Sequence, residues 1–378
     1  MLFDSLYELT HKFMFESRLV AAGAAVVFSF IASMLLFPSY IKKLQKMQFI
    51  SELTDSGTQR QPVMPAGILF LVIISISVML FARMNSYMIS ALAIYVFFSL
   101  IGAVDDVAKV INKGRLARGQ ISKEEYMYKA DGISGTLRLS LYLLISLAVA
   151  GAAYKFIPGI NGHITIPFFS IEKYFPYMVA WIFIPFMALV IAVMANGVNF
   201  TDGFDTLAGV PLITCLLFVG LISYVSSHAG WSSYLRIPCL PGLLELLPLI
   251  GAAVGTLLAF LWFNSPPSSI IMGDSGSIGL GGLVGILFIF VKAEWYLPII
   301  GFIFIIEFAS SFLQIGWYKL TKKRLFRMAP IHHHFQIYMR EAGYYGGEMN
   351  IKSKIAWRFH ILSVILLVVG VILFLKVR

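Results

Sequence analysis

Long apolar segments recur through almost the whole chain, and they constrain its fold more than any other feature of the sequence. Ten segments are apolar over roughly the length of a membrane-spanning helix, about 17–25 residues. They lie at residues 19–37, 66–82, 88–104, 139–154, 176–195, 207–226, 246–262, 277–291, 295–315 and 359–375. Only 13% of the 378 residues are charged, whereas soluble domains carry about 25% charged residues. We therefore predict an all-α, polytopic integral membrane protein with about ten transmembrane helices in a single transmembrane domain, residues 1–378.

The basic residues gather in one set of loops, and this bias predicts the orientation of the chain. Twenty of the 29 Lys and Arg residues fall in the loops after the first, third and ninth spans. Cytoplasmic loops are enriched in Lys and Arg, so we expect these loops in the cytoplasm and both termini on the outer side. The same bias, with anionic lipid headgroups, accounts for the net charge of +10. Membrane lipids, and not nucleic acid, are therefore the expected partners of the basic residues.

Acidic motifs stand at the ends of several spans, and the predicted orientation places all of them on the cytoplasmic face. The first is Asp105-Asp106-x-x-Lys109, at the end of the third span. On a helix, Lys109 shares a face with both carboxylates, and adjacent carboxylates resist joint ionisation unless a cation is near. The alternative is a pair of helix-end acids solvated at the membrane interface.

A second polar motif, Asn199-x-x-Asp202-x-x-Asp205, follows the fifth span. Its spacing of three residues places the side chains on one face if the segment is helical, while Gly203 allows an irregular turn instead. Asp202 could also be an ordinary N-cap of the sixth span. Because three carboxylate or amide groups within seven residues exceed what a cap needs, we interpret the motif as functional.

The third motif is Met272-Gly273-Asp274-Ser275-Gly276, between the seventh and eighth spans and preceded by Asn264. Glycines let backbone amides approach a phosphate, and an aspartate can bind Mg²⁺ through oxygen. The alternative is a capping loop before the eighth span. Carboxylates beside a bilayer are costly and are usually functional, so the three motifs together suggest a metal-phosphate site.

Three consecutive histidines, His332-His333-His334, follow the ninth span. Neighbouring side chains on a helix cannot all face one ion, and zinc sites prefer spaced ligands. The nearby Arg324, Arg327 and Arg340 favour contact with a pyrophosphate or a sugar phosphate. Glu307, within the ninth span, has no assigned role: helix packing and substrate contact remain equal alternatives.

Together these motifs resemble those of the polyprenyl-phosphate N-acetylhexosamine-1-phosphate transferase superfamily, and the histidine run is similar to that of its bacterial peptidoglycan branch. The resemblance covers essentially the whole chain. The chain departs from the family pattern in four places. The Gly-Thr-Pro-Thr-Met-Gly-Gly stretch after the first span is lengthened to residues 57–67, and the family's Asp-Gly-Leu-Asp-Gly-Leu is Asp202-Gly-Phe-Asp-Thr-Leu207. An aromatic that commonly precedes Met-Gly-Asp is Ile271, and the glutamate expected after the histidine run is Gln336.

This resemblance implies a Mg²⁺-dependent enzyme of the bacterial cytoplasmic membrane with its active site at the cytoplasmic face. The implied reaction transfers phospho-MurNAc-pentapeptide from UDP-MurNAc-pentapeptide to undecaprenyl phosphate, giving lipid I and UMP for peptidoglycan synthesis. It leaves open whether the chain forms a homodimer.

The resemblance also implies a role for each matching residue. The implied catalytic residues are Asp105, Asp106 and Asp274. Of these, Asp274 is the expected Mg²⁺ ligand, and Asp105 or Asp106 would act on the lipid phosphate or assist the metal. The residues implied to bind the nucleotide and pyrophosphate are Asn199, Asp202, Asp205 and Asn264. The residues implied to contact the sugar-phosphate region are His332 and His333. The lysines that would neutralise phosphate charge are Lys109 and Lys129.

Other functions remain as alternatives. A related enzyme would transfer GlcNAc-1-phosphate to the same lipid. A secondary transporter would also contain acids within the membrane, but transporters typically show repeated halves and broken helices at the midplane. A zinc-dependent intramembrane hydrolase would need metal-ligand spacing, which the sequence does not show.

Overall fold

The computed structural model describes residues 2–375 apart from 11–15, 51–52, 56–57, 61, 121, 123–133, 167–168, 170, 172–173 and 345. The described chain is almost entirely helical. Its helices are α1 (Leu2–Thr10), α2 (Arg18–Lys46), α3 (Gly67–Phe81), α4 (Ser86–Ala117), α6 (Gly135–Phe156), α7 (Ala180–Thr201), α8 (Gly209–Ser226), α9 (Ala229–Leu235), α10 (Leu247–Asn264), α11 (Gly273–Phe290), α12 (Leu297–Ile300), α13 (Phe302–Thr321), α14 (Ile331–Glu341) and α15 (Gly347–Leu375), with 3-10 turns η2 (Pro241–Leu246) and η3 (Glu294–Tyr296). A small antiparallel hairpin, β1 (Leu53–Asp55) and β2 (Thr58–Arg60), pairs Thr54 with Gln59.

Each of the ten predicted spans coincides with a helix or, in one case, with a broken helix. Among the described residues, eight helices are long and apolar enough to cross a membrane, and the bent pair formed by Glu294–Ile300 and Phe302–Thr321 raises the number to nine. The remaining predicted span is α3, an apolar helix of 15 residues. The protein is therefore a polytopic, all-helical membrane protein, while the total of ten crossings stays a prediction.

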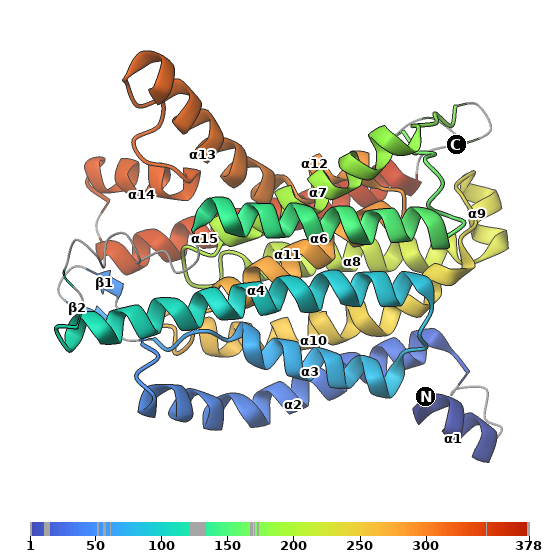
Figure 1. Cartoon of the computed structure of the whole chain (residues 1–378), viewed down its shortest axis with the longest axis horizontal. Coiled ribbons are helices and arrows are strands. Elements are labelled where there is room, and N and C mark those ends of the chain that lie inside the picture. Colours follow the sequence, from blue (N-terminus) through green and yellow to red (C-terminus); the bar gives the residue numbers. More distant parts are fainter. Residues whose placement is uncertain are drawn as a thin grey trace.

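The ninth span differs from the prediction of one continuous helix. It bends by 85° at Gly301, between α12 and α13. Glycine costs about 1 kcal/mol relative to alanine inside a helix, so the break falls at a residue that favours it. In Figure 1, α13 leaves the bundle at a steep angle.

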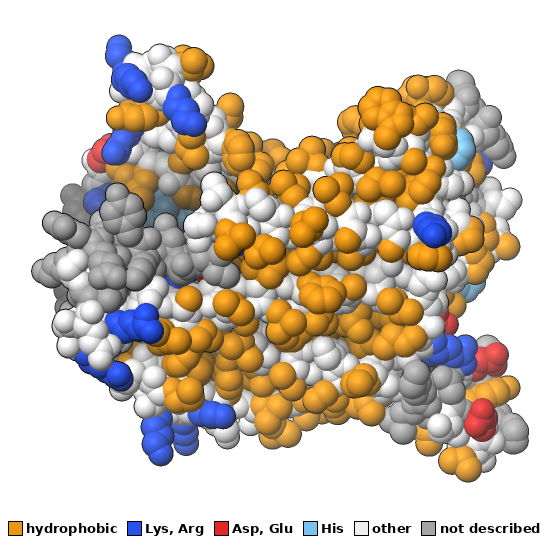
Figure 2. All heavy atoms as spheres, in the orientation of Figure 1, with side chains coloured by type: hydrophobic (Ala, Val, Ile, Leu, Met, Phe, Trp, Pro, Cys, Tyr) orange, Lys and Arg blue, Asp and Glu red, His pale blue; other side chains and the backbone are white. Residues whose placement is uncertain are grey.

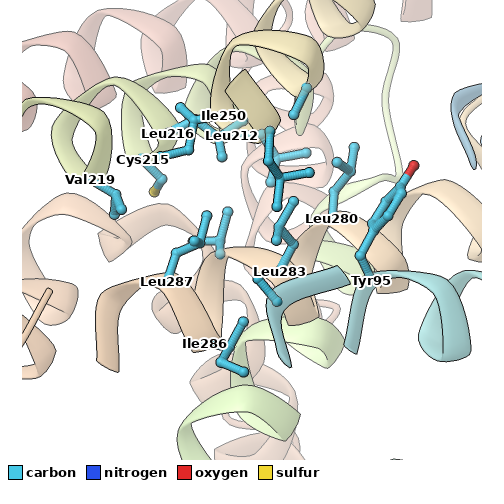
Figure 3. Packing of buried hydrophobic residues seen from close by; sticks show 14 of the residues in the cluster. Tyr95, Leu212, Cys215, Leu216, Val219, Ile250, Leu280, Leu283, Ile286 and Leu287 are labelled. Atoms are coloured by element: carbon cyan, nitrogen blue, oxygen red, sulfur yellow. The ribbon is translucent and has the colours of Figure 1, made fainter. Parts of the chain in front are cut away.

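The helix α11 forms the centre of the bundle. Of its most apolar 18-residue window, 94% is buried inside the protein. Its side chains interlock with those of α8, α10 and α4, as Figure 3 shows for Leu280, Leu283, Ile286 and Leu287 against Leu212, Cys215, Leu216, Val219, Ile250 and Tyr95. On another side, α7 approaches so closely that a Cβ on Gly285 would lie 2.8 Å from the Cα of Ile191. The surrounding helices therefore fix the position of the N-terminal turn of α11, which carries Asp274.

The two ends of the bundle differ in character. The N and C marks both lie at one end in Figure 1, whereas the C-terminal ends of α4, α7 and α10 and the start of α11 lie at the other. Figure 2 shows hydrophobic side chains over the middle of the visible face, with Lys and Arg side chains gathered toward the second end. This arrangement agrees with the predicted common side of the acidic motifs; that this side is cytoplasmic stays a prediction.

Candidate active site

The first and third acidic motifs meet through two cationic side chains. The Lys109 Nζ atom lies 2.8 Å from the Asp105 carboxylate and 2.9 Å from that of Asp274. A guanidinium nitrogen of Arg138, in the first turn of α6, lies 3.2 Å and 3.0 Å from the same two carboxylates. Lys109 and Asp105 share one helical face, as their spacing predicts. A cluster of two carboxylates and two cations therefore forms where α4, α6 and α11 meet.

Asp106 has a different role from its neighbour. Its two carboxylate oxygens accept the backbone N–H groups of Asp274 and Ser275 at 3.0 and 2.9 Å. These groups belong to the start of α11, where backbone donors lack partners within the helix, so Asp106 caps α11 from another helix. Both Asp105 and Asp106 are fully buried, and the alternative of a solvated acid pair at the interface is wrong.

The backbone at Gly273 makes this capping contact feasible. Gly273 has a positive φ of 75°, which favours glycine. A Cβ at this position would lie 2.9 Å from an Asp106 oxygen. Glycine therefore lets the loop turn and lets the Asp106 carboxylate reach the first amides of α11.

The second motif joins the same cluster from the end of α7. The Asn199 side-chain amide donates to Asp274 Oδ1 at 2.9 Å and to Ser277 Oγ at 3.1 Å. Asp202 is the C-terminal cap of α7, and the interpretation of Asp202 as the N-cap of the sixth span is wrong, since Ala208 holds that position in α8. The reason is that α7 runs six residues past the predicted end of the span.

Asp202 lies in a strongly negative environment. Burial raises the pKa of its carboxyl well above the ordinary value, and the negative charges of Asp274 and Asp106 raise it further. Such a carboxyl group either binds a proton or stays ionised beside a cation. The surroundings of Asp202 are therefore suited to a cationic ligand.

Asp205 and Asn264 brace the loops around the cluster. Asp205 accepts hydrogen bonds from the hydroxyl and the backbone N–H of Ser268, at 2.8 and 3.4 Å. The Asn264 side chain accepts from the backbone N–H of Thr206 at 2.6 Å and donates to the carbonyl of Ile270 at 2.7 Å. These two side chains thus tie the loop after α7 to the loop before α11.

The motifs enclose a cavity of about 230 Å³. Its lining combines carboxylates, amides and apolar side chains: Met64, Asn199, Asp202, Gly203, Phe204, Asp205, Asn264, Ile271, Gly273 and Asp274. Among the described residues, no three His, Cys, Asp or Glu side chains lie together in an arrangement that could hold a metal by themselves. The oxygen donors of the lining, with Asp202 and Asp274 foremost, are nevertheless the type that Mg²⁺ prefers, with substrate phosphates or water completing its shell.

The histidines lie behind one wall of this cavity. The rings of His332 and His333 pack edge-on against Phe204, with centroids 4.6 and 5.3 Å away. His332 Nδ1 lies 3.0 Å from a Glu307 oxygen, and His333 Nδ1 lies 2.9 Å from the Gln336 oxygen. Burial, and then the charge of His332, lowers the pKa of His333.

His334 and the arginines point to other partners. His334 accepts the backbone N–H of Arg327 at 3.2 Å, away from the cavity. The Arg327 side chain pairs with Glu341 at 2.8 Å, and Arg340 pairs with Glu348. The expected anion-binding surface of Arg324, Arg327 and Arg340 is therefore partly engaged with acidic side chains of the protein itself.

Comparison with known proteins identifies the family. Residues 88–292 match the profile of glycosyl transferase family 4. The chain is 34% identical over 371 residues to the phospho-N-acetylmuramoyl-pentapeptide-transferase of Campylobacter curvus, covering 96% of this chain and 97% of that protein. The enzyme of the same name from Bartonella quintana is 38% identical over 305 residues, covering 80% and 77%, and that from Nautilia profundicola is 34% identical over 377 residues, covering 99% of each.

The chain belongs to the phospho-N-acetylmuramoyl-pentapeptide-transferase family. It is thus a phosphosugar transferase, and the resemblance seen in its motifs is confirmed. The part that matches the glycosyl transferase family 4 profile contains all three acidic motifs, whereas the histidines follow it. The transporter and hydrolase alternatives have no support from these relatives.

Some residues of this transferase site gave little or no signal in the sequence. Arg138 stood out only as a basic charge in a loop, because its partners are 33 and 136 residues away. Ser277 and Phe204 were visible only as motif neighbours. Lys129, expected to neutralise phosphate charge, lies outside the described residues.

The structure also shows the surroundings of Ile271 and Gln336, two of the departures from the family pattern. Ile271 lines the cavity, where an aromatic was expected. Gln336 donates its amide to Glu348 at 2.7 Å while it accepts from His333. A glutamate at position 336 would oppose the carboxylate of Glu348, so the amide suits this surrounding.

Proposed function

We propose that this transferase moves phospho-MurNAc-pentapeptide from UDP-MurNAc-pentapeptide to undecaprenyl phosphate, giving lipid I and UMP. The observation that carries the proposal is a cluster beside a polar cavity, formed by Asp105, Asp274, Lys109 and Arg138. The proposal is supported by relatives that are named for this activity and that match the chain over nearly their full length. We place the cavity at the cytoplasmic face of a bacterial inner membrane, where a soluble sugar nucleotide can meet a lipid phosphate.

The sugar nucleotide would occupy the cavity. Asn199, Asp202, Asp205 and Asn264 line it and would bind the nucleotide and pyrophosphate, Asp205 and Asn264 partly by holding the surrounding loops. His332 and His333 would contact the sugar-phosphate region from behind Phe204. Ile271, where the family commonly has an aromatic, would provide an apolar contact to the base.

Asp274 is the proposed Mg²⁺ ligand, and Asp202, which lines the same cavity, is the second carboxylate near it. A Mg²⁺ ion held there would offset the negative charge that develops on the pyrophosphate during transfer. In the described arrangement Lys109, Arg138 and Asn199 hold the two oxygens of Asp274. These residues therefore orient the carboxylate and share its charge.

The lipid phosphate would approach the cations of the cluster. Lys109 and Arg138, held by Asp105, would neutralise it and direct one of its oxygens at the sugar-linked phosphorus. That oxygen forms the new P–O bond as the P–O bond to UMP breaks, so charge passes to the leaving UMP. A phosphate monoester is already largely ionised near neutrality, so the step needs no strong base, and Asp106 acts through the position of Asp274.

One assay separates the proposed donor from its closest alternative. Purified protein in detergent is supplied with undecaprenyl phosphate, Mg²⁺ and either UDP-MurNAc-pentapeptide or UDP-GlcNAc, and the lipid product is identified by mass spectrometry. We expect lipid I from the first donor only, with Asp274→Asn as the inactive control. A product from UDP-GlcNAc alone would instead support the GlcNAc-1-phosphate transferase. Removal of divalent cations with EDTA is expected to stop transfer and added Mg²⁺ to restore it.

A further inference from the structure

Glu307 and His332 form a buried pair behind the active-site cavity. Glu307 is fully buried in α13, and His332 is 1% exposed at the start of α14. Their closest atoms, Glu307 Oε2 and His332 Nδ1, are 3.0 Å apart. An ionised carboxylate only accepts hydrogen bonds, so the proton between these atoms resides on His332 Nδ1. The pair thus fixes both the orientation of the imidazole and the nitrogen that carries its first proton.

The other ring nitrogen of His332 is buried without a hydrogen-bond partner in the described part of the chain. It points at Gly203, where a Cβ would lie 2.5 Å from Nε2. Gly203 is part of the cavity lining, so this nitrogen lies against a lining residue that carries no side chain. Buried polar atoms are nearly always paired in folded proteins. We therefore expect Nε2 to form a hydrogen bond with a group that the protein itself does not supply.

His333 provides a contrast within the same turn. Its Nδ1 contacts the amide oxygen of Gln336, whose amide nitrogen donates to Glu348. A neutral amide orients an imidazole but cannot balance a positive charge, whereas the Glu307 carboxylate can do both. Of the two adjacent histidines, His332 is therefore the one that the protein equips to become an imidazolium.

We propose that Glu307 is a positioning residue of the transfer reaction, which holds His332 so that its Nε2–H donates to a phosphate oxygen of the bound sugar nucleotide. The buried carboxylate balances the positive charge of His332 when that anionic oxygen arrives. This inference rests on the proposed function, because it takes the sugar nucleotide as the occupant of the cavity. It also gives the acid within the ninth span a role in substrate contact by way of His332.

The test compares Glu307→Gln, which keeps the size of the side chain, with Glu307→Asp, which keeps its charge. We expect Glu307→Gln to lower kcat/KM for the sugar nucleotide by about 10- to 100-fold, the range for a hydrogen bond to a charged group. The KM for undecaprenyl phosphate should stay unchanged, and Glu307→Asp should retain more activity than Glu307→Gln. Glu341→Gln is the matched control, because this glutamate pairs with Arg327 at the surface.

A double-mutant cycle links the effect to His332. If Glu307 acts through His332, adding Glu307→Gln to His332→Gln should cause no further loss. Independent, multiplying losses would overturn the inference, as would full activity of Glu307→Gln or a loss confined to the lipid substrate. A large fall in melting temperature for Glu307→Gln would also count against it, by marking a purely structural ion pair.

Wild-type protein in the same assay separates this inference from the proposed function. Absence of lipid I from the wild type would refute the proposed function itself. Normal lipid I formation by both wild type and Glu307→Gln would refute only the role of Glu307.

Discussion

Asp106 accepts the backbone N–H of Asp274 at 3.0 Å, so one acidic motif caps the helix that carries the other. The contact joins residues that are 168 positions apart. The two adjacent acids of α4 therefore have different roles, because Asp105 faces the cations while Asp106 fixes the position of the loop. A carboxylate that accepts hydrogen bonds from two backbone N–H groups holds the backbone in position and is not a free base.

Asp274 should be the most sensitive carboxylate of the site. Asp274→Asn keeps the shape of the side chain but removes the charge that faces Lys109 and Arg138. We expect turnover to fall by about 100- to 1,000-fold, corresponding to the loss of a main electrostatic stabiliser, about 3–4 kcal/mol. Initial rates measured across a Mg²⁺ titration provide the check. Near-normal turnover with unchanged Mg²⁺ dependence would remove Asp274 from its proposed role.

Two glycines of α4 should respond oppositely to alanine. A Cβ on Gly102 would lie 2.4 Å from the carbonyl oxygen of Asp274, whereas one on Gly114 would have no neighbour within 4 Å. Gly102→Ala should displace the Asp274 loop and lower both activity and melting temperature. Gly114→Ala should be neutral or stabilise by up to about 1 kcal/mol through helix propensity. Equal behaviour of the two variants would show that the close contact of α4 with α11 is unimportant.

The native cysteines offer a test of orientation. Cys239 is exposed, whereas Cys215 is buried. Cys239 follows α9, which lies in Figure 1 at the end of the bundle that carries the N and C marks. In spheroplasts, an impermeant thiol reagent should therefore label Cys239. In a Cys239→Ser background, a cysteine at Asn161 should also react, while one at Ser122 or Lys323 should react only after lysis. The reverse pattern would invert the predicted topology.

His333 should make the protein sensitive to mild acid. Burial lowers its pKa in the folded state, while the unfolded chain has the ordinary value of about 6.5. Above that pH neither state binds the proton, so His333 does not change the free energy of unfolding. As the pH falls below about 6.5 toward the folded pKa, the unfolded state binds the proton first, and the free energy of unfolding decreases. The melting temperature of His333→Gln should therefore fall less than that of the wild type between about pH 7.5 and 5.5. Parallel curves of melting temperature against pH for the two proteins would refute the prediction.

The sequence predicted the helices and the clustering of motifs because both depend on local patterns. Apolar length locates a span, and the i, i+4 spacing of Asp105 and Lys109 already places them on one helical face. Their common end of the bundle followed from counting spans. Helix ends were less certain: α7 continues to Thr201, because the polar Asn196 and Asn199 end the apolar run without ending the helix.

The parts that could not be predicted depend on contacts between distant segments. Nothing near Arg138 in the sequence indicates that it reaches Asp105 and Asp274. The capping role of Asp106 is equally hidden, because its partners are backbone amides and leave no trace in side-chain chemistry. Glu307 stands out in the sequence as an acid in a span, but its role needed the 85° bend that precedes it and the position of His332.

Two glycines of the cavity lining, Gly203 and Gly273, contribute backbone but no side chain. A Cβ on Gly203 would lie 2.5 Å from a ring nitrogen of His332, and one on Gly273 would lie 2.5 Å from the Cβ of Pro65. A point mutation cannot remove backbone atoms, and an added side chain would disrupt the packing here. An inhibitor that binds to this backbone therefore leaves the cell few resistance mutations, and those have to arise at replaceable side chains of the lining such as Ile271 and Phe204.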